Sequence, residues 1–236
     1  MCGRFSLTTP SAALRDLFGF DELPNLPPRY NIAPTQDVAA VRLVGDDPKP
    51  HFTLFRWGLI PSWAKDVAIG ARLINARAET VAEKPAFRHA FRRRRCLIPA
   101  DGFYEWEKRP DGGKQPWRVT LEGDVPFAFA GLWEHWMGAD GGEIESCTIV
   151  TTEAAPSIAR IHGRMPVILD PADFPAWLTG TPKAALALLH SYRGKLAAYP
   201  VGTRVNSVRN DDAELLKPVS PAAPPAKPQK AQLDLL

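Results

Sequence analysis

The chain of 236 residues is long enough for one domain with a substantial core, and its 45% hydrophobic and 23% charged residues are ordinary for a soluble protein. No apolar run approaches the roughly 20 residues that cross a bilayer, and the first residues lack a basic stretch followed by an apolar one, so neither a membrane protein nor a secreted protein is expected. Three cysteines cannot form a closed disulfide framework, which favours a reducing cytoplasmic setting, and a net charge of +3 with 19 arginines against 10 lysines hints at a partner that carries phosphate.

Secondary structure can be predicted in chain order from hydrophobic periodicity and turn residues. Residues 9–19 predict a capped amphipathic helix that ends near Gly19, and the proline-rich residues 24–36 predict a loop. Strands rich in β-branched and aromatic residues are predicted at 38–44, 52–60, 96–106, 117–123, 127–136 and 147–152. Further helices are predicted at 83–94, 155–162 and 183–192.

The order of these elements indicates the fold class. Helices interleave with strands without a regular alternation, which favours an α+β domain over a series of βαβ units. We therefore expect a curved, barrel-like, mostly antiparallel sheet surrounded by helices, formed by residues 2–217. Residues 218–236 consist mainly of Pro, Ala and Lys with little to bury, and they predict a disordered tail.

Metal and nucleotide sites have no support in the sequence. The chain contains five histidines but no HExxH motif and no paired CxxC motifs, so no zinc site is expected. The phosphate-binding motifs GxGxxG and GxxxxGK[ST] are also missing from the sequence. We expect a protein that uses neither a metal nor a nucleotide cofactor.

Cys2 directly follows the initiator methionine, so removal of Met1 would place a free α-amine beside its thiol. Because an α-amine has a pKa of about 7.7–8.0 against about 10.4 for lysine, its neutral fraction near pH 7 is roughly a few hundred times larger. Cys2 is therefore a candidate nucleophile, although a cysteine at this position can also be accidental. Cys96 and Cys147 lie inside predicted strands, which is typical of small buried hydrophobic residues.

Two candidate acid–base residues occur in the chain. Strand alternation places Tyr104 and Trp106 on one face of their strand and Phe103 and Glu105 on the other. A carboxylate held among aromatic rings has a raised pKa and can transfer a proton, whereas a solvent-exposed one has neither property. His162 stands at the end of a predicted helix, where a histidine either takes part in catalysis or only caps the helix.

Asn75, Arg77 and Trp63 are candidates for ligand binding. Asn75 and Arg77 are two positions apart and share one face of an extended segment, so they can hold an oxygen and a phosphate or merely satisfy loop carbonyls. Trp57 and Trp63 flank a proline turn, where an exposed tryptophan stacks on a base and a buried one belongs to the core. Residues 86–96 carry six basic side chains, a pattern typical of a solvated face that can also attract a polyanion.

Several motifs together resemble one known family. They are MCGRF, RYNIAPTQ, WGLIPSWAKD, LINARAET, CLIPADGFYEW, IHGRMPVIL and VNSVRND. In this order, from Cys2 to about Pro218, they resemble the SOS-response-associated peptidase (SRAP) family, the abasic-site processing proteins of bacteria and eukaryotes. The resemblance implies the SRAP fold for nearly the whole domain.

The resemblance also implies a mechanism. Family members capture an abasic site in single-stranded DNA, and their processed N-terminal cysteine closes a thiazolidine ring on the sugar aldehyde, which shields the lesion during the DNA damage response. The implied catalytic residues are Cys2, Glu105, Asn75 and His162. The implied DNA-binding residues are Arg4, Arg77, Arg164 and Trp63. The family usually has aspartate after the histidine, whereas this chain has Gly163, which leaves the orientation of His162 open.

The resemblance further implies removal of Met1, either autoproteolytically or by an aminopeptidase, with abasic-site lyase activity and crosslink reversal as additional activities. It implies a monomer that binds abasic single-stranded DNA and associates with the nucleoid during DNA damage. Three other classes of protein remain open at this point. They are an N-terminal-nucleophile amidotransferase, which would need an Asn-Gly pair that this chain lacks, a cysteine protease acting in trans, and a non-catalytic DNA-binding module.

Overall fold

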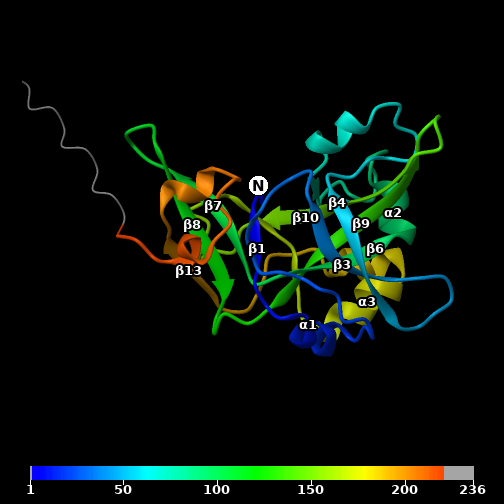
Figure 1. Cartoon of the computed structure of the whole chain (residues 1–236), viewed down its shortest axis with the longest axis horizontal. Coiled ribbons are helices and arrows are strands. Elements are labelled where there is room, and N and C mark those ends of the chain that lie inside the picture. The colour runs from blue at the N-terminus through cyan, green and yellow to red at the C-terminus, as the bar shows by residue number, and fades with distance from the viewer. Residues whose placement is uncertain (1, 221–236) are drawn as a thin grey trace, which may run out of the picture.

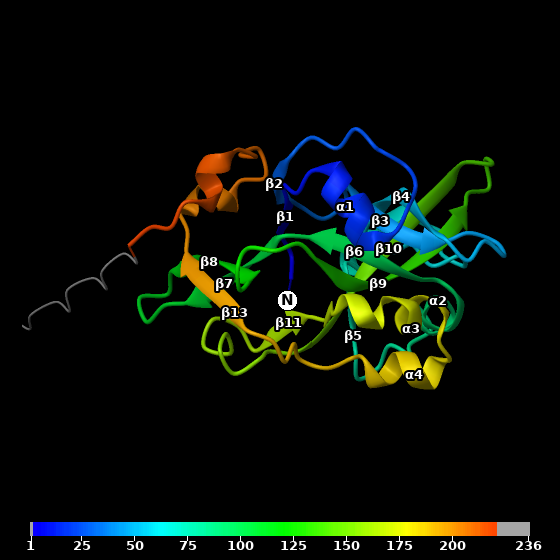
Figure 2. The same cartoon turned by 90° about the horizontal axis from the view of Figure 1, so that it is seen from below.

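The computed structural model describes residues 2–220 and contains two β-sheets, seen from two directions in Figures 1 and 2. The first sheet consists of β1 (Phe5–Leu7), β2 (Arg29–Ile32), β7 (Gly102–Lys108), β8 (Lys114–Leu121) and β13 (Leu196–Pro200). Its strand order is β13-β8-β7-β1-β2, and every neighbouring pair is antiparallel.

The second sheet closes on itself as a barrel. Its main strands are β3 (Asp37–Leu43), β4 (Pro50–Trp57), β6 (Arg95–Ala100), β9 (Phe127–Met137) and β10 (Glu143–Glu153). They follow the order β10-β4-β3-β6-β9, and β9 pairs with β10 to complete the ring. The β10–β4 pair is parallel and the other pairs in the ring are antiparallel. The predicted α+β fold with a barrel-like, mostly antiparallel sheet is thus confirmed.

Short elements complete the fold around the barrel. The short strands are β5 (Asn75–Arg77) and β11 (Arg164–Pro166), which both pair with β10, and β12 (Ile168–Leu169), which pairs with β9. The α-helices are α1 (Ser11–Phe18), α2 (Arg88–Arg93), α3 (Phe174–Thr179) and α4 (Pro182–Ala187). The 3₁₀ helices are η1 (Val67–Arg72), η2 (Pro171–Asp173), η3 (Thr203–Asn206) and η4 (Ala213–Leu216). Within residues 2–220 no helix has the length and apolar character needed to cross a bilayer.

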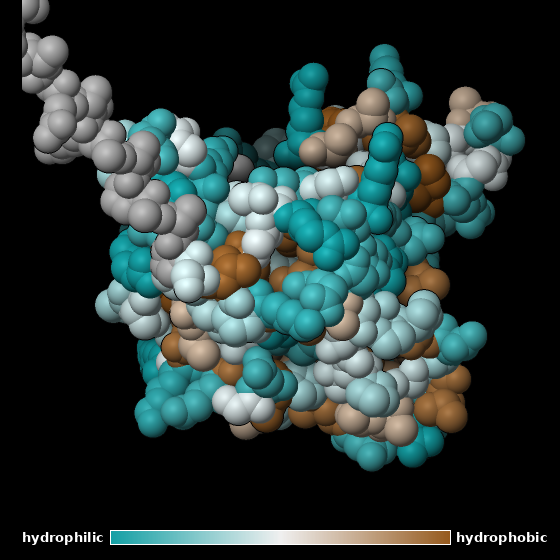
Figure 3. Space-filling model, turned by 60° about the vertical axis from the view of Figure 1, so that its left-hand side comes forward, coloured by the Kyte–Doolittle hydropathy of each residue, from teal (hydrophilic) through white to brown (hydrophobic). Residues whose placement is uncertain are grey.

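The strand β1 joins the two sheets through an aromatic cluster. The Phe5 ring on β1 packs edge-on against Trp57 of β4 and Phe129 of β9, with ring centroids 5.2 and 5.6 Å apart. Phe103 of β7 packs against the same Phe129 ring at 6.1 Å. Because these rings are buried, the sheet that carries β1 is held against the barrel by apolar burial. The face of the molecule in Figure 3 is mainly hydrophilic, with hydrophobic residues in small separate patches.

A buried polar network fixes β1 against β7. Asp101, which precedes β7, accepts hydrogen bonds from Ser6 Oγ at 2.6 Å and from Thr8 Oγ1 at 2.8 Å. Its carboxylate also pairs with the buried Arg118 guanidinium at 3.4 Å. Removing one partner from such a buried pair costs about 3–5 kcal/mol. Asp101 therefore contributes strongly to the alignment of β1, which follows Cys2 in the chain.

The predicted elements agree with the structure where one local pattern dominates. The first predicted helix forms at Ser11–Phe18 and ends at Gly19, whose φ of 75° is left-handed, although Pro10 at its N-cap provides no side-chain hydrogen bond. All the predicted strands form, but residues 96–106 divide into β6 and β7 around Asp101. The predicted helices at 83–94 and 183–192 are shorter than expected, forming only at α2 and α4.

Two predictions of local structure are wrong. Residues 155–162 form successive turns instead of a helix, because backbone hydrogen bonds converge on the carbonyls of Ala155 and Ile158 instead of following the helical ladder. The predicted loop at 24–36 contains β2, because pairing with β1 satisfies its backbone despite the flanking prolines.

The predicted tail begins with paired residues. Val219 donates its backbone N–H to Pro200 O at 2.9 Å, and Pro218 forms a β-bridge with Val201. The chain therefore stays attached to the end of β13 beyond the predicted domain boundary at residue 217. The remainder of the predicted disordered tail, residues 221–236, lies outside the described residues.

Candidate functional site

Cys2 lies three residues before the start of β1, and its side chain is fully buried. Asn75 on β5 donates its side-chain Nδ2 to the Cys2 carbonyl oxygen at 2.7 Å. Because β5 pairs with β10, with Asn75 opposite Ile149, this amide holds the N-terminal segment against the barrel. The Asn75 Oδ1 atom is buried without a hydrogen-bond partner among the described residues, which leaves an acceptor available to a ligand.

Glu105 on β7 is 3% exposed and lies on the face of the strand that the alternation predicts. Tyr104 belongs to a separate apolar cluster that includes Trp106, on the opposite face from Glu105. Burial raises the pKa of the Glu105 carboxyl, and nearby positive charge, including that of His162, opposes part of this effect. A carboxyl in this setting keeps its proton to a higher pH than an exposed glutamate.

The Cys2 thiol responds to the same environment. Burial raises the pKa of this thiol, and the negative charge of Glu105 raises it further. Glu105 interacts electrostatically with both Cys2 and His162, so the three side chains lie near one another. The structure thus brings together Cys2, Asn75, Glu105 and His162, which lie in four motifs distant from one another in the sequence.

His162 is oriented by the backbone of the residues that follow it. Its Nδ1 atom lies 3.0 Å from the Arg164 N–H, which donates to it, and 3.1 Å from Arg164 O. A Cβ atom at Gly163 would meet no heavy atom within 4 Å, so the loop has space for a side chain there. The position of the ring therefore does not depend on a side chain at residue 163.

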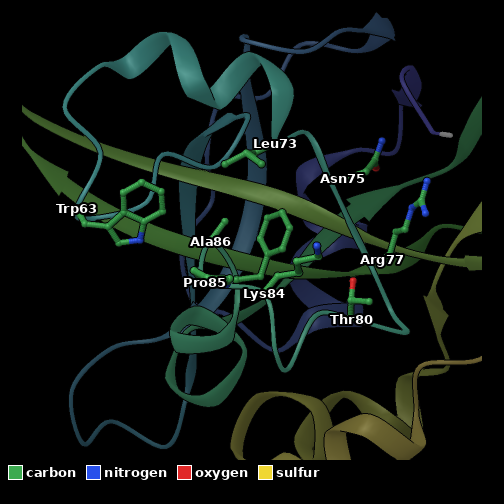
Figure 4. A pocket seen from close by; sticks show the side chains of 9 residues that line it. Trp63, Leu73, Asn75, Arg77, Thr80, Lys84, Pro85 and Ala86 are labelled. Atoms are coloured by element: carbon green, nitrogen blue, oxygen red, sulfur yellow. The ribbon is translucent and has the colours of Figure 1, made fainter.

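An open cleft of about 620 Å³ adjoins this cluster (Figure 4). The cleft is lined by Trp63, Leu73, Asn75, Arg77, Thr80, Lys84, Pro85, Ala86 and Phe87. Asn75 and Arg77 lie at one end of the cleft and Trp63 lies at the other. Since Asn75 also donates a hydrogen bond to the Cys2 carbonyl, Cys2 lies next to the Asn75 end of the cleft.

The side chains of the cleft suit an anionic ligand with flat rings. Arg77 is exposed at the edge of β5, and Lys84 supplies a second cation to the lining. Trp63 is 59% exposed, so its ring is available for stacking, whereas Trp57 is fully buried and donates its Nε1–H to Ile74 O at 2.9 Å. Trp63 is therefore the exposed tryptophan that can stack on a base, and Trp57 belongs to the core.

Arg164 and Arg4 do not line this cleft, and both donate hydrogen bonds to other residues of the protein. Arg164 binds the Glu79 carboxylate in a bidentate pair at 3.0 and 3.1 Å and also donates to Thr151 O at 2.7 Å. Arg4 donates from Nη1 to Asn31 Oδ1 and Val205 O, both at 2.8 Å. A phosphate-binding role for either arginine stays a prediction, and in this structure both guanidinium groups serve protein contacts.

Sequence reasoning missed Lys84 and Thr80 as residues of the cleft. Neither has an isolated signature, because a lysine in a surface stretch and a threonine after a short strand are common. Their positions follow from the turns that connect β5 to α2, where Lys84 N and Glu83 N both bind Thr80 O. The nearest available signal was their closeness in sequence to the motif that contains Asn75 and Arg77.

Comparison with known proteins places this chain in a family. A model of the SOS response associated peptidase (SRAP) family matches residues 1–208. Abasic site processing protein YoaM of Bacillus subtilis (strain 168) is 43% identical over 223 residues, 92% of this chain and 97% of that protein. Abasic site processing protein HMCES of Gallus gallus is 33% identical over 195 residues, which cover 72% of this chain and 58% of that protein.

Solved structures share the fold. A crystal structure of a protein from Bacteroides thetaiotaomicron has a TM-score of 0.83 at 24% identity and covers 93% of this chain and 100% of that one. A second, from Bordetella bronchiseptica, has a TM-score of 0.75 at 28% identity and covers 85% of this chain and 100% of that one. Since the SRAP family model covers nearly all of this fold, the closed barrel with its antiparallel sheet forms an SRAP domain. The chain belongs to the SOS response associated peptidase family, and the resemblance identified from its motifs is confirmed.

Proposed function

We propose that this protein captures abasic sites in single-stranded DNA by forming a covalent thiazolidine between the processed Cys2 and the ring-opened sugar, which shields the lesion. The observation that carries this proposal is the 2.7 Å hydrogen bond from Asn75, a residue of the cleft wall, to the Cys2 carbonyl. The relatives named as abasic site processing proteins support the choice of DNA lesion. Removal of Met1, by the protein itself or by an aminopeptidase, precedes capture.

The first chemical step uses the α-amine. An open abasic sugar presents an aldehyde, and the neutral amine of Cys2 adds to its carbon to give a carbinolamine. A protonated Glu105 carboxyl then donates its proton to the carbinolamine hydroxyl, which leaves as water and gives a protonated imine. Burial favours this role, since it keeps the carboxyl protonated to a higher pH than an exposed glutamate.

The second step uses the thiol and restores Glu105. The carboxylate takes the proton of the Cys2 thiol while sulfur attacks the imine carbon, which closes a five-membered ring. Because the thiol and imine are already held on one residue, this attack is intramolecular and strongly favoured. The sum of the two steps is aminothiol plus aldehyde giving thiazolidine and one water. Glu105 and His162 also serve crosslink reversal and β-elimination, since both need proton transfer at the same sugar atoms.

The cleft supplies the DNA contacts in this proposal. Trp63 stacks on an unpaired base beside the lesion, which is the reason for assigning single-stranded DNA. Arg77 and Lys84 bind the backbone phosphates on either side of the sugar. Arg4 and Arg164 also bind backbone phosphates, in exchange for some of their present contacts within the protein. The protein acts as a monomer without a cofactor.

Denaturation separates covalent capture from reversible binding. We expect purified protein incubated with single-stranded DNA that contains one abasic site to give a complex that survives boiling in detergent. DNA with an intact base in place of the lesion should give none. A complex that dissociates on boiling would support a reversible DNA-binding module instead and would remove the basis of the proposal.

Asn75→Ala should slow formation of this covalent complex by about tenfold, because the Cys2 carbonyl loses the donor that orients it and one hydrogen bond contributes about 1 kcal/mol or more. Single-turnover crosslinking at saturating protein measures the effect, and melting temperature checks the fold. Gln36→Ala, which alters a side chain outside the cleft lining, serves as the control. Equal rates for Asn75→Ala and the unaltered protein would show that this amide has no part in positioning Cys2.

A further inference from the structure

Helix α2 has a basic face on its exposed side. The buried residues of the helix are Ala90 and Phe91, which attach it to the core. Its exposed residues are Arg88, His89, Arg92 and Arg93. We call the surface formed by Arg88, Arg92 and Arg93 the α2 arginine face. The basic run noted in the sequence thus places three of its arginines in solvent.

The other two arginines of the run have structural roles. Arg94 forms an ion pair with the buried Glu134 carboxylate. Arg95 is 7% exposed and donates to the carbonyl oxygens of Phe91, Trp177 and Gly180. Structural contacts therefore explain the presence of Arg94 and Arg95, but they do not explain the three arginines of the α2 arginine face.

The α2 arginine face is uncompensated within the described part of the chain. Over residues 2–220, no ion pair joins Arg88, Arg92 or Arg93 to an acidic side chain. Arg88 and Arg92 stand one helical turn apart, where like charges repel each other and disfavour the helix. The first turn also contains no acidic residue that would offset this repulsion. An external anion would relieve the repulsion.

The position of the α2 arginine face indicates which anion. Residues 84–87 line the cleft and α2 begins at the next residue, so the helix continues directly from the cleft wall. Figure 4 shows the helix below Pro85 and Ala86, toward the Trp63 end of the cleft and away from Asn75. A strand that occupies the cleft from Arg77 past Lys84 to Trp63 would leave it beside these arginines.

We propose that the α2 arginine face binds the sugar-phosphate backbone of the DNA strand where it leaves the cleft on the Trp63 side of the lesion. This inference rests on the proposed function, because it takes the cleft to hold the abasic strand. Contacts to phosphates carry no sequence information, so this site acts on any sequence and only on one flank of the lesion. An acidic protein partner would match the charge of this face equally well, but it would not explain why the face directly adjoins the cleft.

The test uses oligonucleotides that carry a tetrahydrofuran abasic analogue, which has no aldehyde and cannot be crosslinked. The analogue is placed at the centre, near the 5′ end or near the 3′ end, and binding is measured by fluorescence anisotropy at several salt concentrations. The variant is Arg88→Ala/Arg92→Ala. The control, Lys108→Ala/Lys114→Ala, removes the same charge from the exposed end of the β7–β8 hairpin, at the opposite end of the molecule from α2 in Figures 1 and 2.

The α2 variant should bind the central-lesion oligonucleotide about fivefold more weakly, which corresponds to two exposed ion pairs. The same loss should occur with only one of the two end-lesion oligonucleotides. The slope of the logarithm of the binding constant against the logarithm of the salt concentration should fall in magnitude by about 1.4, roughly 0.7 for each lost phosphate contact. The control should bind all three like the unaltered protein.

Three results would overturn the proposal: an α2 variant that binds all three oligonucleotides normally, an equal loss with both end-lesion oligonucleotides, or the same loss in the control. Normal binding by the α2 variant would leave an acidic protein as the partner of this face. Crosslinking to aldehyde-bearing DNA at saturating protein should be unchanged in the α2 variant. A failure of the unaltered protein to crosslink would contradict the proposed function, while the analogue still tests the α2 arginine face.

Discussion

Cys2→Ala should reduce the detergent-resistant complex with abasic DNA by at least a hundredfold, to the background of the assay. The alanine keeps the small second residue that an aminopeptidase accepts, and variant protein whose intact mass shows that Met1 is gone keeps a free α-amine. This amine can form an imine with the aldehyde, but without a thiol no thiazolidine closes and water reverses the imine. The loss therefore measures the contribution of sulfur alone.

Borohydride makes the Cys2→Ala result specific to the mechanism. Reduction during the reaction converts an imine to a stable amine, so the variant should recover a covalent complex only when borohydride is present. Cys147→Ala, which removes a buried thiol inside the barrel, should crosslink like the unaltered protein at equal folded concentration. A detergent-resistant complex formed by Cys2→Ala without borohydride would show that the thiol is not needed.

Glu105→Gln should slow crosslinking by about a hundredfold, because glutamine keeps the shape of the side chain but cannot donate or accept the proton that each step needs. Affinity for the tetrahydrofuran analogue should stay within about twofold, since the substitution leaves the cleft lining intact. Single-turnover rates and anisotropy measure the two quantities separately. Glu107→Gln, at an adjacent alternate position of the same strand, is the control.

The pH dependence of stability follows from the sign of the Glu105 shift. Its pKa is raised in the folded protein, so ionisation costs more in the folded state than in the unfolded one. The folded protein therefore loses stability relative to the Glu105→Gln variant as the pH rises above the ordinary glutamate value of 4.5. We expect the variant to have the higher melting temperature at pH 7 and to lose this advantage below pH 4.5. A lower melting temperature at pH 7 would indicate that the carboxylate is stabilised by its neighbours.

The candidate residues of the site could be selected from the sequence, but their arrangement in space could not. Cys2, Glu105 and Asn75 were candidates by residue type and were assigned to one site by the resemblance of their motifs to the family, and the structure places them close together. The burial of Cys2 was not predicted, since it depends on β1 packing against barrel strands distant in sequence. The contact of Arg4 with Val205 could not be predicted either, because it joins segments about two hundred residues apart.

The same distinction applies to the fold. Helix α1 and the long hairpin β9–β10 carry local patterns with clear turn residues, and both were predicted. The parallel pair β10–β4 and the insertion of β5 beside β10 are long-range pairings that no local period specifies. Because β5 carries Asn75, the part of the topology that could not be predicted is also the part that completes the site.

The mass of the intact covalent complex tests the central claim most directly. After reaction with an abasic oligonucleotide, denaturation and alkylation with iodoacetamide, the complex should have the mass of the chain without Met1 plus the oligonucleotide minus one water. It should carry two alkyl groups, because the chain has three cysteines and a thiazolidine consumes the thiol of Cys2. A complex that retains Met1, or one that carries three alkyl groups, would contradict the account.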